Sequence, residues 1–202
     1  MKKLKVTAII LASAFLCAGC GGSSSVSVDG NAIIIDKDGK VESQLGSVLD
    51  QDYYDSDELK TTVEGEIQSF NAVNGEGSVE LTEYNYDKSD STVKIVMTFE
   101  SMEDYVDYNS DTDYNFEANN YYSGSVDGTK VALDSLKVVK NGEMVTDAYT
   151  EADNHAMVLV SGENTVVVPG NIVAISENVE VTGKTQAKII SADKPACVIY
   201  EK

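Results

Sequence analysis

Short apolar runs separated by turn signals make up the C-terminal part of the chain, and this spacing limits the folds that it can adopt. Runs of strand length recur between residues 136 and 200, and Asn141-Gly142 and Pro169-Gly170 are two of the turn signals between them. Asn-Gly between two apolar runs is a strong signal for a two-residue hairpin turn. Frequent short strands with turns are typical of sandwiches and of stacked strands. Residues 121–202 are therefore predicted to form a β-rich domain, either a small sandwich or stacked strands.

Residues 31–117 mix helix signals with strand signals. A helix is predicted over residues 57–74, because apolar residues recur there on one helical face: Leu59, Val63, Ile67 and Phe70. Residues 92–99 alternate between apolar and polar, as in a strand with one buried face. A second, short helix is expected after Ser101, where Asp104 completes a capping box. The order β-α-β-β-α predicts an α+β domain with helices on one side of its sheet.

The charge of the chain excludes whole classes of partner. It has 34 acidic side chains against 15 basic ones, and all the basic ones are lysines. Nucleic-acid binding depends on clustered Lys and Arg, so no nucleic-acid partner is expected. Electrostatic docking to anionic lipid is excluded on the same ground. Any link to a membrane must therefore come from an apolar group.

The first residues follow the pattern of a targeting segment. Lys2, Lys3 and Lys5 precede an uncharged, mostly apolar run over residues 6–16, and small residues follow that run. The apolar run is too short to cross a bilayer as a helix, since about 18 apolar residues would be needed. Residues 1–19 are therefore predicted to be a signal peptide.

The end of this segment, Cys17-Ala18-Gly19-Cys20, resembles the lipobox of bacterial lipoprotein precursors. Ala18, Gly19 and Cys20 match the lipobox position by position, whereas Cys17 stands where Leu is usual. The resemblance implies that Cys20 becomes the lipidated first residue of the mature protein. Two acyl chains suffice for stable membrane anchoring. Residues 20–30, with their Gly and Ser run, are then expected to be a flexible tether, and the protein is expected outside the cytoplasm, held to the bacterial cell membrane by lipid.

Competing interpretations of the two cysteines lack partners. A zinc site needs about four ligands, and beyond Cys17 and Cys20 the chain offers only Cys197 and His155. A disulfide between Cys17 and Cys20 is incompatible with removal of the signal peptide. Cys197 is expected to be a buried apolar residue.

Two stretches beyond the signal, Asp52–Lys60 and Val168–Ile172, carry a further likeness. In them the chain resembles uncharacterised lipoproteins of anaerobic Gram-positive gut bacteria. That resemblance implies a shared location in the cell envelope and no particular activity.

No catalytic residue is predicted. His155 is the only histidine, so any triad would have to use it, and no nucleophile motif lies near it. No phosphate-binding glycine loop is present. Among 34 acidic residues, a glycosidase pair of carboxylates cannot be singled out by sequence.

Calcium is the one cofactor that the sequence leaves open. Two acidic series supply candidate ligands: Asp50, Asp52, Asp55 and Asp57, and then Asp107, Asn109, Asp111 and Asp113. The second series resembles the start of an EF-hand loop, but Thr112 and Ala118 stand where that loop needs Gly and Glu. Solvated acidic loops with helix-capping roles are the preferred interpretation, and no cofactor is expected.

Tyrosines offer candidate ligand contacts. Nine of the eleven lie between Tyr53 and Tyr122, including the pairs Tyr53-Tyr54 and Tyr121-Tyr122. A ring with a polar tip suits recognition of glycans or peptides. The alternative, which the sequence favours, is that they serve as half-buried strand residues in a chain without Trp.

The sequence thus predicts a non-enzymatic, lipid-anchored binding or interaction module at the cell surface, with an unknown protein or glycan partner. An enzyme that acts on cell-wall or extracellular glycans through paired carboxylates is the second hypothesis. A structural spacer of the envelope is the third.

Overall fold

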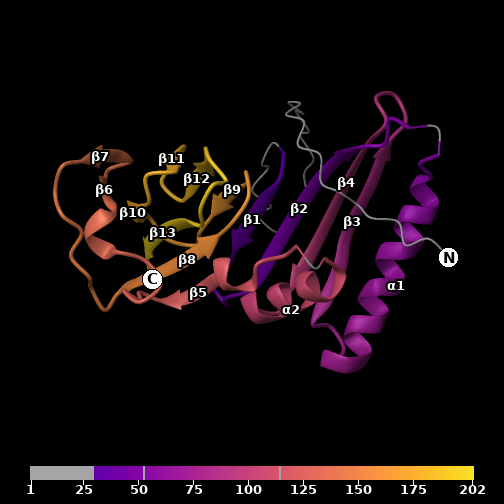
Figure 1. The fold of residues 1–202 in the computed structure, drawn as a ribbon, viewed down its shortest axis with the longest axis horizontal. Helices are drawn as coiled ribbons and strands as arrows, with labels where there is room; N and C mark the ends of the chain where they lie inside the picture. The colour runs from indigo at the N-terminus through magenta and orange to yellow at the C-terminus, as the bar shows by residue number, and fades with distance from the viewer. Residues whose placement is uncertain (1–29, 52, 114) are drawn as a thin grey trace.

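Thirteen strands in two sheets and two α-helices make up the part of the chain that the computed structural model describes, residues 30–51, 53–113 and 115–202 (Figure 1). The fold is therefore mixed but dominated by strands, which confirms the general α+β prediction. Residues 1–29, with Cys17, Cys20 and most of the expected tether, lie outside the described residues, as do residues 52 and 114.

The larger sheet has seven strands in the order β11-β12-β9-β1-β2-β4-β3. Their bounds, in that order, are Val179–Val181, Gln186–Ile189, Thr165–Val167, Ala32–Ile35, Val41–Val48, Thr92–Phe99 and Val79–Asp87. The smaller sheet has the order β5-β8-β13-β10-β6-β7. Its strands are Tyr122–Ser125, His155–Val160, Ala196–Glu201, Ile172–Ile175, Lys137–Lys140 and Glu143–Val145.

The larger sheet joins the two parts of the chain that the sequence separates at residues 117–121. Strand β1 pairs antiparallel with β2 and parallel with β9, where Ala32 lies opposite Thr165. Strands β9, β11 and β12 thus extend a sheet begun by β1–β4, and the C-terminal strands are divided between both sheets. A backbone ladder therefore crosses the boundary expected from sequence.

Helices α1 (Ser56–Asn74) and α2 (Met102–Thr112) form where the sequence places helix signals. The Asp55 side chain caps α1 by accepting from the backbone N–H groups of Asp57 and Glu58, and Ser101 caps α2 through the N–H of Asp104. These bonds satisfy donors that the first helical turn leaves without partners. Two short 3-10 helices, Ala118–Asn120 and Leu133–Ser135, lie in the connections that follow.

One main core joins both helices to both sheets. Helix α1 contacts β3 and α2, while α2 contacts β4 and β5. Phe99 of β4 is fully buried, and the rings of Tyr105 and Tyr108 in α2 lie 5.1 and 5.6 Å from its ring. The same cluster continues through Ile33 of β1 to Val158 of β8. The two sheets and the helices are therefore held by a continuous apolar interior.

The smaller sheet is buried on its other face as well. Met157 and Leu159 of β8, with Cys197 and Ile199 of β13, form a second core that the segment between β5 and β8 covers. Residues at alternate positions of one strand point to opposite faces of a sheet. Because β8 and β13 are central and buried on both faces, they read as continuous apolar runs in the sequence.

Candidate functional site

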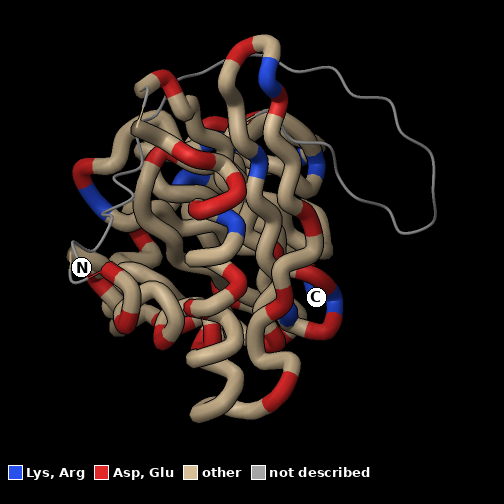
Figure 2. Tube along the Cα trace, turned by 90° about the vertical axis from the view of Figure 1, so that its right-hand side faces the viewer, with Lys and Arg blue, Asp and Glu red and all other residues tan. Residues whose placement is uncertain are grey.

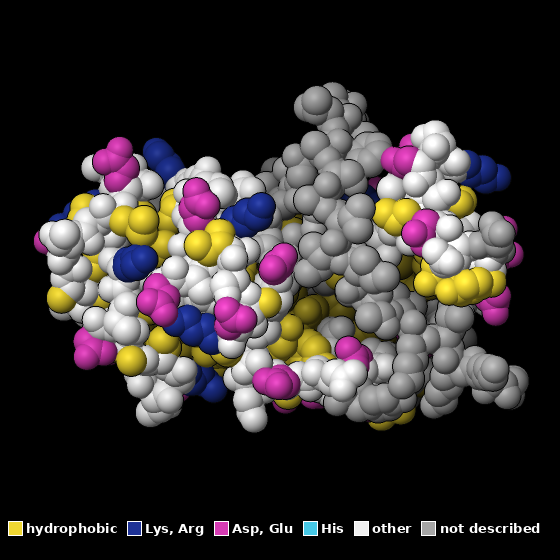
Figure 3. Space-filling view, turned by 45° about the horizontal axis from the view of Figure 1, so that its top comes forward, with side chains coloured by type: hydrophobic (Ala, Val, Ile, Leu, Met, Phe, Trp, Pro, Cys, Tyr) yellow, Lys and Arg dark blue, Asp and Glu magenta, His cyan; other side chains and the backbone are white. Residues whose placement is uncertain are grey.

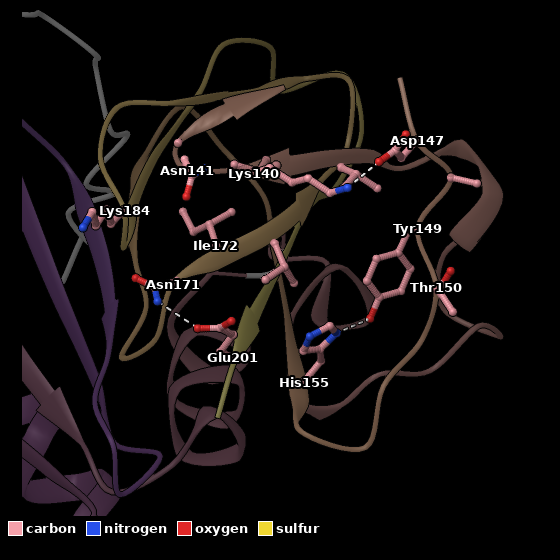
Figure 4. Close-up of a pocket in the computed structure, with 15 residues that line it drawn as sticks. Lys140, Asn141, Asp147, Tyr149, Thr150, His155, Asn171, Ile172, Lys184 and Glu201 are labelled. Atoms are coloured by element: carbon pink, nitrogen blue, oxygen red, sulfur yellow. Dashed lines mark hydrogen bonds and ion pairs between the residues drawn. The ribbon is translucent and has the colours of Figure 1, made fainter. Parts of the chain in front are cut away.

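A cavity of about 670 Å³ lies at the end of the smaller sheet where β8 begins and β13 ends (Figure 4). This volume is within the range of sites for small molecules. Its polar lining comes from segments far apart in the sequence: Lys140, Asn141, Asp147, Tyr149, Thr150, His155, Asn171, Lys184 and Glu201. Its apolar lining comes from Val138, Val139, Ala148, Ile172 and Val173. The mixture of a few polar groups with an apolar floor is what ligand sites generally show.

Strand register brings His155 and Glu201 together. They are partners in the antiparallel pairing of β8 with β13. Residues directly opposite each other in such a pair have side chains on the same face, with Cβ atoms about 5 Å apart. By strand alternation this is the face of Met157 and Ile199. The buried apolar face therefore ends in a polar pair, and both side chains project into the cavity (Figure 4).

Three contacts hold the polar side chains of the cavity. The Asn171 amide nitrogen donates to a carboxylate oxygen of Glu201 at 2.8 Å. The Tyr149 hydroxyl lies 3.0 Å from Nδ1 of His155. Lys140 and Asp147 form an ion pair across the wall (Figure 4). Most charged groups of the lining are thus already oriented before any ligand arrives.

The Tyr149 hydroxyl can select one tautomer of His155. Burial, helped by the negative charge of Glu151, raises the pKa of Tyr149, so its hydroxyl stays protonated and can donate. A neutral imidazole has one donor nitrogen and one acceptor nitrogen. When the hydroxyl donates to Nδ1, the ring carries its proton on Nε2, and Nε2 makes no hydrogen bond within the described residues. His155 then offers an N–H donor beside the Glu201 carboxylate.

The lining of the cavity has no net formal charge, because Lys140 and Lys184 balance Asp147 and Glu201. The rest of the chain, in contrast to this lining, carries an excess of acidic side chains. Residues 30–120 have 22 acidic side chains against five lysines, and Figure 2 shows acidic residues on the side that carries α1. Residues 121–202 have 11 acidic side chains against seven lysines. Figure 3 shows lysines and acidic side chains intermixed over the C-terminal strands. The cavity is therefore in the less acidic part of the chain.

A second hollow, of about 1140 Å³, lies between the β1–β2 turn, the start of α2, β5 and the end of β13. Asn171 and Glu201 line both hollows. The segment next to them is tightly packed, since a Cβ on Gly170 would be 1.7 Å from the carbonyl oxygen of Glu201. Gly170 is thus needed for the close approach that places Asn171 beside Glu201.

The second acidic series does not form the loop expected from the sequence. Asp107, Asn109 and Asp111 lie inside α2, and Asp113 is its C-cap, so the prediction of a loop there is wrong. Residues two apart on a helix do not face each other, and Asn109 hydrogen-bonds the Tyr105 carbonyl instead. The apolar residues Tyr105 and Tyr108 bury this segment as a helix against β4.

The first acidic series serves the start of α1. Asp55 caps the helix and Asp57 lies in its first turn, which agrees with the capping role favoured from sequence. Asp50 accepts a hydrogen bond from Gln51, and Asp52 lies outside the described residues. Over the residues that the structure describes, no three His, Cys, Asp or Glu side chains are grouped so as to hold a metal ion.

The two tyrosine pairs lie in separate parts of the molecule and do not line the cavity. Tyr53 and Tyr54 lie before α1, where Tyr53 is 71% exposed. Tyr121 is half-buried and stacks on Phe116 at 4.5 Å. The hydroxyl of Tyr122 donates to the Ser125 carbonyl. Tyr121 and Tyr122 are thus packing residues, as the alternative interpretation of the tyrosines expects.

Tyr149, Asn171 and Glu201 were not predicted from the sequence as site residues, and His155 was considered there only for a catalytic triad and as a zinc ligand. The single signal for the site was the rarity of histidine, because Asn171 and Glu201 stand in turn and strand patterns that recur elsewhere in the chain. Cys197 is buried, as expected, and burial raises the pKa of its thiol to about 12.

Comparisons with protein-family models, with curated protein sequences and with solved structures gave no match for this chain. The site is therefore interpreted from its own geometry.

Within the described residues, neither helix combines the length and the apolar character that crossing a bilayer requires.

Proposed function

We propose that the chain is a lipid-anchored, extracytoplasmic binding module whose ligand occupies the cavity at the end of the smaller sheet. The observation that carries the proposal is the convergence of oriented polar side chains on a hollow of about 670 Å³. Side chains that are already oriented lose less conformational entropy when a ligand binds. A cavity lined in this way favours a binding role over that of an envelope spacer.

In this proposal the two halves have different tasks. The larger sheet, with its helices on one side, is the structural base that stands on the tether of residues 20–30. The smaller sheet, all of whose strands come from residues 122–201, carries the cavity. Cys20 carries the acyl chains that hold the protein to the bacterial cell membrane, outside the cytoplasm. The lipid is the membrane partner, and no nucleic acid takes part.

The anchor is tested by mass spectrometry of the Cys20 peptide from the membrane fraction of a bacterial host. A diacylglyceryl thioether on Cys20 is expected. Cys20→Ser should abolish the thioether, and the protein should then either keep its signal peptide or be released without lipid. The matched control Cys17→Ser should leave lipidation of Cys20 unchanged. Unmodified Cys20 in wild-type protein would refute the anchor.

The binding role is tested on the full chain purified in detergent. The melting temperature is measured with a panel of neutral saccharides, amino acids, nucleosides, polyamines and short peptides, because a ligand of the folded state raises it. Glu201→Gln keeps the shape of the cavity, and Glu180→Gln, on β11 outside the cavity, is the control. At least one class of compound should raise the melting temperature of the wild type, and this rise should be smaller for Glu201→Gln. A panel without effect would leave the spacer as the better explanation.

One observation supports the enzyme as a second candidate. Asp147 and Glu201 line the same cavity, as a glycosidase would require of its two carboxylates. Against this, Asp147 is paired with Lys140 and Glu201 is held by the Asn171 amide, so we infer a role without catalysis. Release of reducing ends from cell-wall polysaccharide, abolished by Asp147→Asn, would overturn that inference.

A further inference from the structure

The polar groups at the end of β8 and β13 offer a ligand a donor and an acceptor side by side. The Glu201 carboxylate only accepts hydrogen bonds, and in the tautomer of His155 that accepts from Tyr149 the Nε2–H only donates. The Asn171 amide, which already donates to Glu201, has a further N–H and a carbonyl oxygen for a ligand. A group that binds here must donate and accept within the same few ångströms.

This requirement separates the classes of polar ligand. An ammonium group only donates and a carboxylate only accepts, so each would satisfy one side of the pair and leave the other desolvated without a partner. His155 and Glu201 are half-buried, so a group that covers them without pairing them removes contacts with water that it does not replace. A hydroxyl group does both, and two hydroxyl groups on adjacent carbons can contact Glu201 and His155 together.

The charge of the lining points in the same direction. Lys140 is neutralised by Asp147, and the ammonium group of Lys184 lies at the rim, directed away from the other labelled side chains (Figure 4). An anionic ligand would therefore find no free cation of the lining directed into the cavity. A cationic group could pair with Glu201 but would leave the His155 donor without an acceptor, whereas a neutral hydroxylated ligand can satisfy both.

The remaining lining suits the carbon framework of a ring that carries hydroxyl groups. The rings of Tyr149 and His155 lie with centroids 5.9 Å apart and planes tilted by 33°. Val173, which like Tyr149 packs on the second core, lines the same cavity. Aromatic rings with a polar tip combine an apolar face with hydrogen bonding. The C–H groups of a sugar ring can pack against these surfaces while its hydroxyl groups contact the polar edge.

We propose that the ligand of the cavity is a neutral saccharide, with adjacent hydroxyl groups bound by Glu201, Asn171 and His155. This inference rests on the proposed binding function and names the class of its ligand. The Glu201 carboxylate accepts from one hydroxyl group, and His155 donates to its neighbour. Tyr149 acts as a positioning residue, because its hydroxyl holds the imidazole in the tautomer that donates from Nε2.

The test is a calorimetric titration of the full chain in detergent with neutral mono- and oligosaccharides, with amino acids and with polyamines. Neutral saccharides should bind and raise the melting temperature. Glu201→Gln should weaken their binding at least tenfold, as expected for loss of a charged hydrogen-bond acceptor. His155→Phe should weaken it about fivefold, and Glu180→Gln should have no effect. Unfolding of each variant without ligand is measured first, so that only folded protein is compared.

Deoxy analogues of the tightest saccharide give the sharper measurement. Removing the hydroxyl that contacts Glu201 should weaken binding to the wild type about tenfold but change binding to Glu201→Gln little, because the two changes remove the same contact. Equal losses in both proteins would overturn the assignment of that contact.

The outcomes separate this inference from the function on which it rests. If amino acids or polyamines bind through Glu201 and neutral saccharides do not, the ligand class is wrong but the binding function stands. If no compound of any class binds, both are overturned.

Discussion

Adding one methyl group at two glycines should have opposite effects on stability. Gly170→Ala places a Cβ 1.7 Å from the carbonyl oxygen of Glu201 and 2.8 Å from its carbonyl carbon. Gly65→Ala, in α1, places a Cβ where no atom lies within 4 Å. Neither glycine has a positive φ, so the contrast depends on space alone and not on backbone conformation.

The size of each effect follows from the local geometry. Ordinary contact begins at 3.4 Å, so the backbone at Gly170 must move by about 1.7 Å relative to Glu201. A shift of that size breaks the 3.0 Å hydrogen bond from the Glu201 N–H to the Asn171 carbonyl. Overpacking and the lost bond together cost about 3 kcal/mol in free energy of unfolding. At Gly65 the better helix propensity of alanine adds about 1 kcal/mol.

Urea unfolding and thermal unfolding of the full chain in detergent, both monitored by circular dichroism, measure the two changes. For a chain of this length we expect Gly170→Ala to lower the melting temperature by about 6–12 °C and Gly65→Ala to raise it by about 2–4 °C. A stability of Gly170→Ala within about 0.5 kcal/mol of wild type would refute the close approach of residues 169–171 to Glu201. The position of Asn171 in the cavity would then be wrong too.

Three further changes test other parts of the fold. Phe99→Ala should destabilise the protein by about 3–5 kcal/mol in urea unfolding, because it removes the fully buried ring between the sheet and α2. Partial desolvation of the Glu66 carboxyl, in a residue that stays exposed, raises its pKa. The stability tied to its proton is present at acid pH and is lost as the pH rises through this raised pKa. Glu66→Gln should therefore be slightly more stable than wild type in urea unfolding at pH 7, with no such gain at acid pH. Cys197, with its pKa near 12 and no exposed surface, should resist iodoacetamide at pH 8 in native protein and react fully in urea, as mass spectrometry of its peptide would show; rapid labelling of native protein would contradict its burial.

Local signals of the sequence predict most of the elements. The helix with Leu59 and Phe70 on one face forms, because apolar spacing and the Asp55 cap act within a few residues of each other. The hairpin at Asn141-Gly142 also forms, with φ of 55° and 83°, both in the left-handed region that Gly and Asn tolerate. Such signals depend on neighbouring residues alone, and they can be read without knowing the fold.

The pairing of distant strands and the candidate site could not be predicted from such local signals. Nothing near Ala32 indicates that β1 pairs with β9 about 130 residues later, because parallel pairing depends on the packing of the whole core. The spacing of Asp107 and Asp111 resembles that of a metal-binding loop, but both residues lie in α2. The helix is favoured there because its Tyr105 and Tyr108 are buried in the core, and this burial depends on the whole fold.

The sequence by itself determined the helix caps and the turns, and it is the source of two expectations, a lipid anchor at Cys20 and no nucleic-acid partner. The tertiary structure alone decided that two sheets share one core and that His155 faces Glu201. That pairing arises from the register of β8 against β13, and the register is set by the apolar faces that both strands bury. A site made of residues 46 positions apart in the sequence exists only once those faces are packed.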